Sequence, residues 1–424
     1  METNTVNKSK EHFISNNSNN KLKELKSDFF LRIFFEFIPM KRGLDSIKYN
    51  KYIQNRIKIN INNYKIYSET FSSVEIEIIP KKNEKITPFI NINVDEKYYH
   101  IYFNNEKEKE IKETNLNKTN KVSKINVIIS YQVKSFSKLF NSCKCIVSIN
   151  FKHFYRNNIT DMSYMFNECS SLKELNLTNF NTNNVTKMNS MFYKCSSLTK
   201  INLANFNTNN VTDMNNMFFD CSSLKELNLT NFNTNKVTNM SYMFTGCSSL
   251  KKLNLKNFNT SNVTNMDSMF NNCSSIKELN LKNFKTNNVI NMSCMFSGCS
   301  LIKELNLTNF NTNKVIYMSF MFSYCSSLKK INLTNFNTSN VISMNDMFND
   351  CSSLKKLNLK NFNTNNVTDM SYMFSYCSSL EELNLTNFNT NNVINMNNMF
   401  FECSDELKSK IKTKYKNFKE EAFY

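Results

Sequence analysis

The residues with the clearest chemical potential in this 424-residue sequence are its cysteines. Ten of them recur at a constant interval of 26 residues: Cys169, Cys195, Cys221, Cys247, Cys273, Cys299, Cys325, Cys351, Cys377 and Cys403. Thiols can ligate zinc or form disulfides, but zinc sites need close pairs such as C-x-x-C, and this column supplies one thiol per interval. We therefore expect no metal and no cofactor, and we predict a column of buried, reduced core thiols.

Other residue types that commonly carry catalysis are scarce. The histidines are His12, His100 and His153, and the sequence has no Gly-rich phosphate loop, nucleophile elbow or metal-ligand spacing. We therefore expect that the protein is not an enzyme and that its chemistry is recognition.

The cysteine interval belongs to a repeat that runs from about residue 133 to residue 404. Full copies begin at Ile159 and then every 26 residues from Val185 to Val367, without insertion or deletion. A truncated copy begins at Val393, and a weaker one begins at Val133. A fixed period of this length is typical of solenoids, in which each copy is one structural unit.

Within one copy the apolar spacing changes from a helical to a strand period. The first half has apolar residues at i, i+3, i+4 and i+7: Met188, Met191, Phe192 and Cys195. The second half has the spacing of a short strand: Leu198, Ile201 and Leu203. With Thr186 as the helix N-cap, each copy is predicted to be one helix-turn-strand-turn coil.

A single coil of this size buries too little apolar surface to fold alone, so the copies must stack. Stacking lets each strand pair with the next at about 4.8 Å, and we expect one continuous parallel sheet along the array. The predicted fold is an α/β repeat. It is a solenoid with a short helix plus a parallel strand per 26-residue coil, preceded by a small α+β N-terminal region.

The repeat also matches a known pattern. The stretch "LKELNLTNFNT" fits L-x-x-L-x-L, and "NVTDMSYMFSYCSSLEELNLTNFNT" at 366–390 closely resembles the BspA-like leucine-rich repeats. That family is associated with adhesion and with binding to other proteins, on bacterial surfaces and in protists. The resemblance implies a leucine-rich-repeat solenoid with a protein-binding role.

The chain is expected to divide into five parts. They are a disordered polar tail (1–20), a helical module (21–66), a small β-rich unit that caps the solenoid (67–132), the repeats (133–404) and a C-terminal capping helix (405–424). The helical module, broken at Pro39 and Gly43, weakly resembles an F-box at Phe34, Ile38 and Leu44. This resemblance implies that the module could recruit a component of a ubiquitin ligase.

Basic residues predominate, with 53 Lys and Arg against 35 Asp and Glu, which favours acidic partners. Outward positions on and beside the predicted strands carry many lysines: Lys251, Lys252, Lys256, Lys277, Lys282, Lys303, Lys329, Lys330, Lys355, Lys356 and Lys360. The candidate partner-binding residues among them are Lys252, Lys256, Lys282, Lys330, Lys356 and Lys360. This stripe is either a solvated face or a site for an acidic protein, a glycan or a nucleic acid. Nucleic acid is the least favoured, because the stripe lacks interleaved aromatic residues and arginine.

The predicted helix face varies between copies whose core residues are nearly identical. Aromatic residues occur there in several copies and are candidates for a recognition patch: Tyr242, Phe320, Tyr324, Tyr372 and Tyr376. The alternative is that these positions tolerate any residue.

These observations predict a non-catalytic, monomeric scaffold that binds another protein. An intracellular F-box-type substrate adaptor of a ubiquitin ligase and a surface adhesin are the alternatives. The opening stretch "METNTVNKSKEHFISNNSNN" has no secretory signal pattern, and the apolar run at 29–38 is too short to span a bilayer. With the reduced thiols, this favours the cytoplasm over the surface location that the family resemblance implies, and we expect no membrane insertion.

Overall fold

The computed structural model describes residues 44, 47–81, 85–92, 96–106, 108–119, 121–154 and 156–424. The chain divides into two compact units, Met1–Ser72 and Ser73–Tyr424. The predicted disordered tail and most of the helical module lie outside the described residues, as do Phe34 and Ile38 of the F-box-like pattern.

The described part of the first unit contains two short helices, α4 (Lys51–Arg56) and α5 (Ile61–Thr70). The side chain of Asn50 caps α4 by accepting a hydrogen bond from the Ile53 N–H at 3.2 Å. Ile53 packs with Ile47 in a small core of their own.

The second unit begins with an antiparallel sheet that leads into the repeats. Its order is β3-β5-β1-β6-β7, with these bounds: β1 Val74–Pro80, β3 Tyr99–Phe103, β5 Ile125–Ile129, β6 Ile146–His153 and β7 Glu174–Asn176. A separate antiparallel pair joins β2 (Thr87–Pro88) to β4 (Asn115–Leu116), and a 3-10 helix η1 spans Glu96–Tyr98. β1 is antiparallel to β6, and β6 is parallel to β7. The sheet therefore covers the first edge of the repeat array and is continuous with it.

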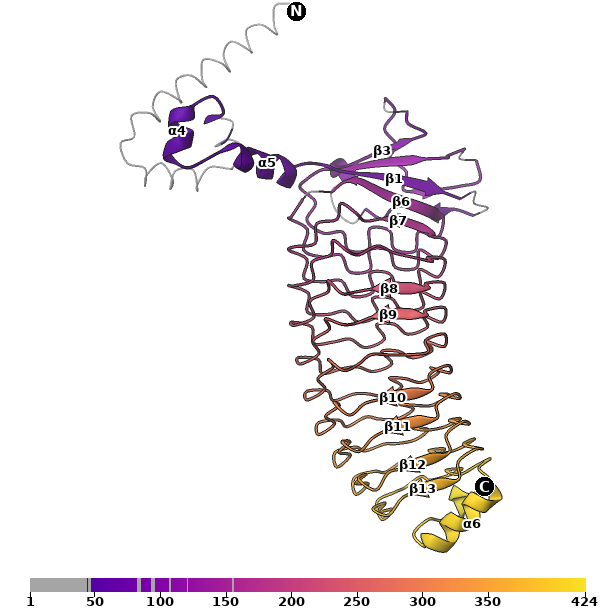
Figure 1. Ribbon diagram of the computed structural model, residues 1–424. Coiled ribbons are helices and arrows are strands. Elements are labelled where there is room, and N and C mark those ends of the chain that lie inside the picture. The colour runs from indigo at the N-terminus through magenta and orange to yellow at the C-terminus, as the bar shows by residue number, and fades with distance from the viewer. Residues whose placement is uncertain are drawn as a thin grey trace, which may run out of the picture. The chain divides into compact units, whose positions relative to one another are not determined.

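From about residue 133 to residue 404 the chain forms stacked coils of 26 residues (Figure 1). A parallel bridge joins the same position of successive coils, from Ser135–Asp161 to Asp369–Asn395. The predicted repeat solenoid is confirmed.

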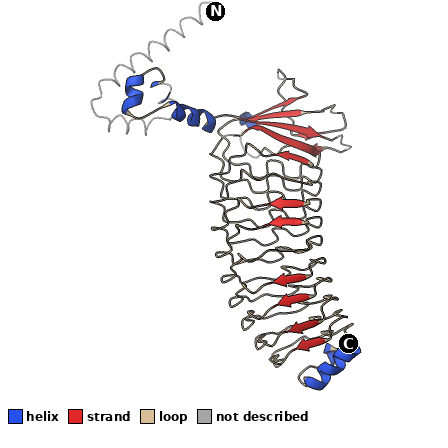
Figure 2. Cartoon of the chain, viewed as in Figure 1, coloured by secondary structure: helices blue, strands red, loops and turns tan. Residues whose placement is uncertain are grey.

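The helix predicted in each coil is wrong. No residue between 156 and 404 is helical, and Figure 2 shows turns where the helices were expected. In the coil that starts at Val185, Ser190 and Lys194 have φ of 56° and 54°, and the same two positions have positive φ in every coil. A right-handed helix requires negative φ throughout. The apolar spacing persists, because successive turns bring the same residues to the core.

The hydrogen bonds explain why turns replace the helix. The N–H groups of Ser190, Phe192 and Lys194 donate to carbonyls of the next coil at 2.9, 2.9 and 2.7 Å. An α-helix would direct these groups along its own axis. Here every second N–H of the segment links two coils, so stacking replaces internal helical bonding.

The core is a set of identical columns along the array. Phenylalanine rings from Phe140 to Phe400 stack face to face, with centroid separations of 5.4 to 5.8 Å. Columns of methionine, cysteine and leucine beside them are fully buried. Aromatic pairs of this kind contribute about 0.5–1.5 kcal/mol beyond area burial. Packing therefore explains why these core residues are nearly identical in every repeat.

A column of buried threonines joins the coils at one corner. The Thr260 hydroxyl donates to the Lys285 carbonyl at 2.8 Å and accepts the Lys285 N–H at 2.7 Å. The same pair of bonds recurs at the equivalent threonines. Each hydroxyl thus satisfies both backbone groups of one residue in the next coil.

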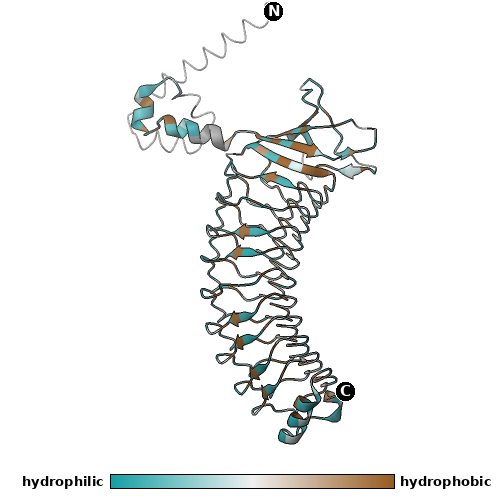
Figure 3. Ribbon diagram, turned by 45° about the vertical axis from the view of Figure 1, so that its right-hand side comes forward, coloured by the Kyte–Doolittle hydropathy of each residue, from teal (hydrophilic) through white to brown (hydrophobic). Residues whose placement is uncertain are grey.

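The strands pair two by two, so the predicted continuous parallel sheet is wrong. Parallel pairs form between β8 and β9, β10 and β11, and β12 and β13, with these bounds: Glu226–Asn228, Lys252–Asn254, Glu304–Asn306, Lys330–Asn332, Lys356–Asn358 and Glu382–Asn384. In Figure 3 these strands carry both hydrophobic and hydrophilic residues.

The paired strands carry opposite charges at equivalent positions, although Lys252 and Glu278 face each other without a strand pair. Each of the three pairs sets a glutamate opposite a lysine: Lys252–Glu226 at 3.2 Å, Lys330–Glu304 at 3.1 Å and Lys356–Glu382 at 2.5 Å. Between β11 and β12, where no strand pairing forms, Lys330 and Lys356 occupy equivalent positions. Opposite charges across a strand pair stabilise it, and like charges destabilise it.

The C-terminal residues cover the last coil. Ser404 caps α6 (Asp405–Lys414), which buries Leu407 and Ile411. After the 3-10 helix η2 (Glu420–Ala422), the Phe423 ring stacks on Phe400 at 5.2 Å. The Asn398 and Phe400 N–H groups donate to the carbonyls of Glu421 and Ala422 at 2.9 and 2.7 Å, so this tail takes the place of a further coil. None of the helices in the described residues is long and apolar enough to cross a membrane.

Candidate binding surfaces

The thiol column lies in the core. All thirteen cysteines are free, and all are buried except the half-buried Cys294. The Cys195 thiol donates to the Phe166 carbonyl of the preceding coil at 3.1 Å, and the column repeats this contact. Burial raises the pKa of the Cys195 thiol to about 12, so it is protonated at neutral pH. A protonated, buried thiol is a poor nucleophile and a poor metal ligand.

The candidate aromatic residues occupy the positive-φ positions. Tyr242, Phe320 and Tyr372 stand at the first such position of their coils, and Tyr324 and Tyr376 stand at the second. Tyr324, Tyr376 and Tyr372 are 53%, 49% and 40% exposed. Phe320 and Tyr242 are half-buried. The structure therefore places these residues on the turns of the coils and not on a helix face.

The candidate aromatic residues form two groups and one separate member. Phe320 and Tyr324 share one coil, while Tyr372 and Tyr376 lie two coils further on, at a distance of about 10 Å. Tyr242 belongs to neither group, and its hydroxyl donates to the Asp267 carboxylate at 2.8 Å. Burial and, next, this carboxylate raise the pKa of Tyr242 to about 12.

Backbone geometry accounts for much of the variation between copies. Residues that tolerate positive φ fill many of these positions: Asn216, Asp220, Gly246, Asn272, Gly298, Asp346, Asp350 and Asn398. A tyrosine or phenylalanine there costs roughly 1–2 kcal/mol of backbone strain. Aromatic residues are a minority in these two columns, which also include Tyr164, and small residues are the most frequent.

The sequence analysis missed a second group of exposed apolar residues. Ile290, Ile342 and Ile394 are 41%, 40% and 79% exposed. Most copies have threonine at this position, and the Thr264 hydroxyl donates to the Thr238 carbonyl of the preceding coil at 3.2 Å. Isoleucine cannot make this bond, so the replacement leaves an apolar edge. The change from "NVT" to "NVI" within the repeat was the available signal.

The candidate lysines are all exposed but differ in their surroundings. Three of them, Lys252, Lys330 and Lys356, are in the cross-strand ion pairs with glutamate. The other three have no ion pair among the described residues: Lys256, Lys282 and Lys360. Part of the predicted basic stripe is therefore a mixed-charge surface.

The asparagine that follows each strand has a structural role. Its side-chain oxygen accepts the N–H two residues further on, as in Asn254 to Lys256 at 3.1 Å and Asn358 to Lys360 at 3.1 Å. This turn ends the strand and starts the corner of the coil.

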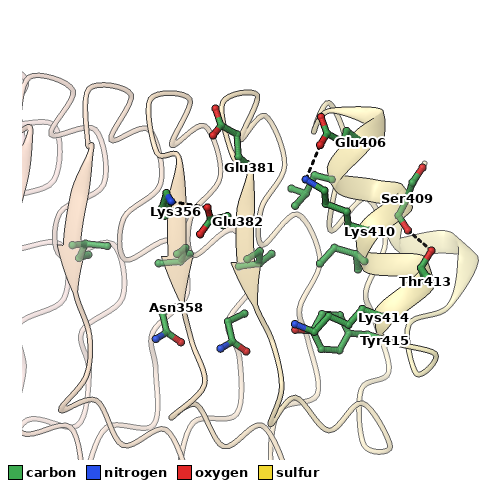
Figure 4. Close-up of a pocket in the computed structure, with 16 residues that line it drawn as sticks. Lys356, Asn358, Glu381, Glu382, Glu406, Ser409, Lys410, Thr413, Lys414 and Tyr415 are labelled. Carbon is green, nitrogen blue, oxygen red and sulfur yellow. Dashed lines mark hydrogen bonds and ion pairs between the residues drawn. The ribbon is translucent and has the colours of Figure 1, made fainter.

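A groove of about 1070 Å³ lies between the last strands and α6 (Figure 4). Apolar residues such as Leu383 and Ile411 line it together with charged ones. The charges pair within the groove, Lys356 with Glu382 at 2.5 Å and Lys410 with Glu406 at 2.6 Å.

A family comparison agrees with this architecture. The family model described as "Mycoplasma protein of unknown function, DUF285" matches residues 134–227, 221–330 and 301–415. The chain belongs to this family. The three matches to the DUF285 model follow one another along the coils, as expected for a tandem array. Among curated proteins, none matches the chain.

Proposed function

We propose that this DUF285 protein is a non-catalytic scaffold that binds another protein through Tyr324, Tyr372, Tyr376 and Phe320. The observation that carries the proposal is an aromatic side chain that is exposed and strained at once. Tyr324 is 53% exposed and has φ of 59°. Some equivalent positions hold glycine or asparagine, such as Gly246, Asn272 and Gly298, which avoid the backbone strain and expose no aromatic ring. A residue that costs stability and exposes apolar area is expected where a partner covers it.

The chemistry of the patch supports a protein partner. Tyrosine is enriched among the residues that dominate binding energy, because it combines apolar area with a hydroxyl. The phenylalanine ladder and the links between coils hold these side chains on a rigid frame, which lowers the entropy cost of binding.

We also propose that the coils are BspA-like leucine-rich repeats, that the protein is a monomer and that it works in a reducing compartment. The L-x-x-L-x-L core supports a BspA-like leucine-rich repeat. Covered ends, by β1 at one side and by the C-terminal tail at the other, support a monomer. Buried, protonated thiols support a reducing compartment such as the cytoplasm. Labelling of the protein at the surface of intact cells would instead favour the adhesin alternative.

An affinity capture tests the binding role. The bait is the full chain, compared with a Tyr372→Asn, Tyr376→Asn double variant, because asparagine accepts positive φ and keeps the fold. A Tyr164→Asn variant is the matched control, since Tyr164 has the same backbone conformation near the other end of the array. We expect the double variant to lose a partner that the control retains, with at least a tenfold weaker Kd for the purified pair. Equal recovery of every partner by the three baits would rule out this patch.

A further inference from the structure

A row of unpaired lysines runs along the strand side of the solenoid. The residue just before each strand position is lysine in six successive coils. Lys355 pairs with Glu381 at 3.4 Å, and the lysine ladder is the other five: Lys225, Lys251, Lys277, Lys303 and Lys329. All five are exposed, and none has an ion pair among the described residues. The Lys251 N–H donates to the Lys225 carbonyl at 2.8 Å, which fixes the separation at about one coil, near 4.8 Å.

The ladder is not needed for the fold. Like charges on neighbouring coils repel each other, so this row opposes stacking. Lys256 and Lys282 add further unpaired charge on the other side of the strands. Of the nearby glutamates, Glu226 and Glu304 are in ion pairs, and Glu278, which lines two hollows on this face, has no ion pair among the described residues. Lysines outnumber these carboxylates, so the surface keeps a net positive charge.

Three shallow hollows, of about 500, 550 and 640 Å³, lie along this face. The first shares Lys256 with the second and Glu278 with the third, so together they form one trough. The side-chain NH₂ groups of Asn254 and Asn280 have no hydrogen-bond partner among the described residues. Most polar groups along the trough therefore donate hydrogen bonds, and a ligand rich in acceptors suits it.

The trough lacks the features that other classes of partner need. No exposed aromatic side chain lines it in the described residues, so it offers no stacking platform for nucleic-acid bases and no anchor for a protein hot spot. A linear polyuronate presents one carboxylate on every ring, and its hydroxyls and carboxylates accept hydrogen bonds.

We propose that this trough binds a linear acidic polysaccharide, with its anionic groups on lysines of the ladder and its ring hydroxyls on the asparagine amides. Each contact is weak and screened by salt, but a repeating ligand engages several coils at once and gains affinity through multivalency. This surface is separate from the aromatic patch.

Binding of polygalacturonate, which carries a carboxylate on every ring, tests the proposal. The ladder variant changes Lys251, Lys277, Lys303 and Lys329 to glutamine. The matched control removes the same charge from exposed lysines away from the trough: Lys118, Lys236, Lys314 and Lys416. Affinity is measured by calorimetry over a salt series, with neutral dextran as the uncharged polymer.

We expect the native chain to bind polygalacturonate and not dextran. The ladder variant should bind at least tenfold more weakly with a shallower salt dependence, whereas the control should change less than threefold. No binding at low salt, or equal weakening of both variants, would overturn the proposal. Tighter binding of oligothymidylate or of poly-glutamate would also overturn it and assign the trough to that class. None of these outcomes depends on the tyrosine variants.

Discussion

At the scale of single residues, each coil has two positions with positive φ between side chains that are fully buried. Met188, Phe192 and Cys195 are buried, as their apolar spacing predicts. Ser190 and Lys194 lie at the variable positions between them, and they have positive φ, which a helix face excludes. Apolar spacing reports which side chains turn inward, and it contains no direct information on φ. The recurrence of Asn, Asp and Gly at these two columns was the signal that could have revealed it.

Gly246 and Tyr324 test the backbone interpretation in opposite directions. A Cβ at Gly246 would meet Asp220 at 3.0 Å from Oδ1 and 3.2 Å from Cα, and φ there is 72°. Gly246→Ala should therefore lower the free energy of unfolding by about 1–2 kcal/mol. Tyr324→Asn should raise it by about 0.5–1 kcal/mol, because the strain is relieved. Urea denaturation followed by circular dichroism measures both. A stable Gly246→Ala together with a destabilised Tyr324→Asn would contradict the geometry.

At the scale of elements, strand periods were predictable but helices were not. The L-x-x-L-x-L spacing correctly placed Glu226–Asn228 and six equivalents in strands, but the same spacing at 200–202 and 278–280 forms no strand. The i, i+3, i+4, i+7 spacing fits a helix, and it fits equally a chain of turns that satisfies its N–H groups in the next coil. A local pattern cannot distinguish these cases, because the deciding hydrogen bonds join residues 25 apart. The interruption of the sheet likewise has no counterpart in the repeat, because 200–202 and 278–280 have the same apolar spacing as the paired strands.

The threonine corner allows a test of coil-to-coil bonding. Thr260→Val keeps the shape but leaves the Lys285 N–H and carbonyl without the hydroxyl that each now contacts. An unsatisfied buried group costs about 1–3 kcal/mol, so we expect a loss of roughly 2–4 kcal/mol in the free energy of unfolding. Thr260→Ser retains the hydroxyl and should lose about 1 kcal/mol, measured by the same urea denaturation. Equal losses for the two variants would show that the hydroxyl is not what links the coils.

At the scale of the whole molecule, repetition makes small local effects add. The stacked repeat solenoid was predictable because a fixed 26-residue period permits few architectures, whereas the α/β class was not, because no coil contains a helix. The binding partner was not predictable, since the core residues that dominate the sequence would be the same in every copy whatever the surface binds.

The small effects of single residues also add along the column of buried cysteines. Burial raises the pKa of Cys195, Cys247, Cys325 and Cys403 to about 12, and the pKa of the other buried thiols of the column rises too.

This column should make the protein sensitive to alkali. Each thiol has a higher pKa folded than unfolded, so its contribution is complete below about pH 9 and is lost as pH rises toward 12. The loss is about 1.4 kcal/mol per pH unit for each thiol, and across the column it exceeds a typical total stability of about 5–15 kcal/mol within one to two units above pH 9. We expect the urea midpoint to be constant from pH 7 to 8 and to fall steeply by pH 10. Replacing Cys195 and Cys247 with valine should make that fall shallower, whereas valine at the half-buried Cys294 should change it little. A midpoint at pH 10 equal to that at pH 8 would show that the thiols remain neutral in the unfolded chain or are not buried in the folded one.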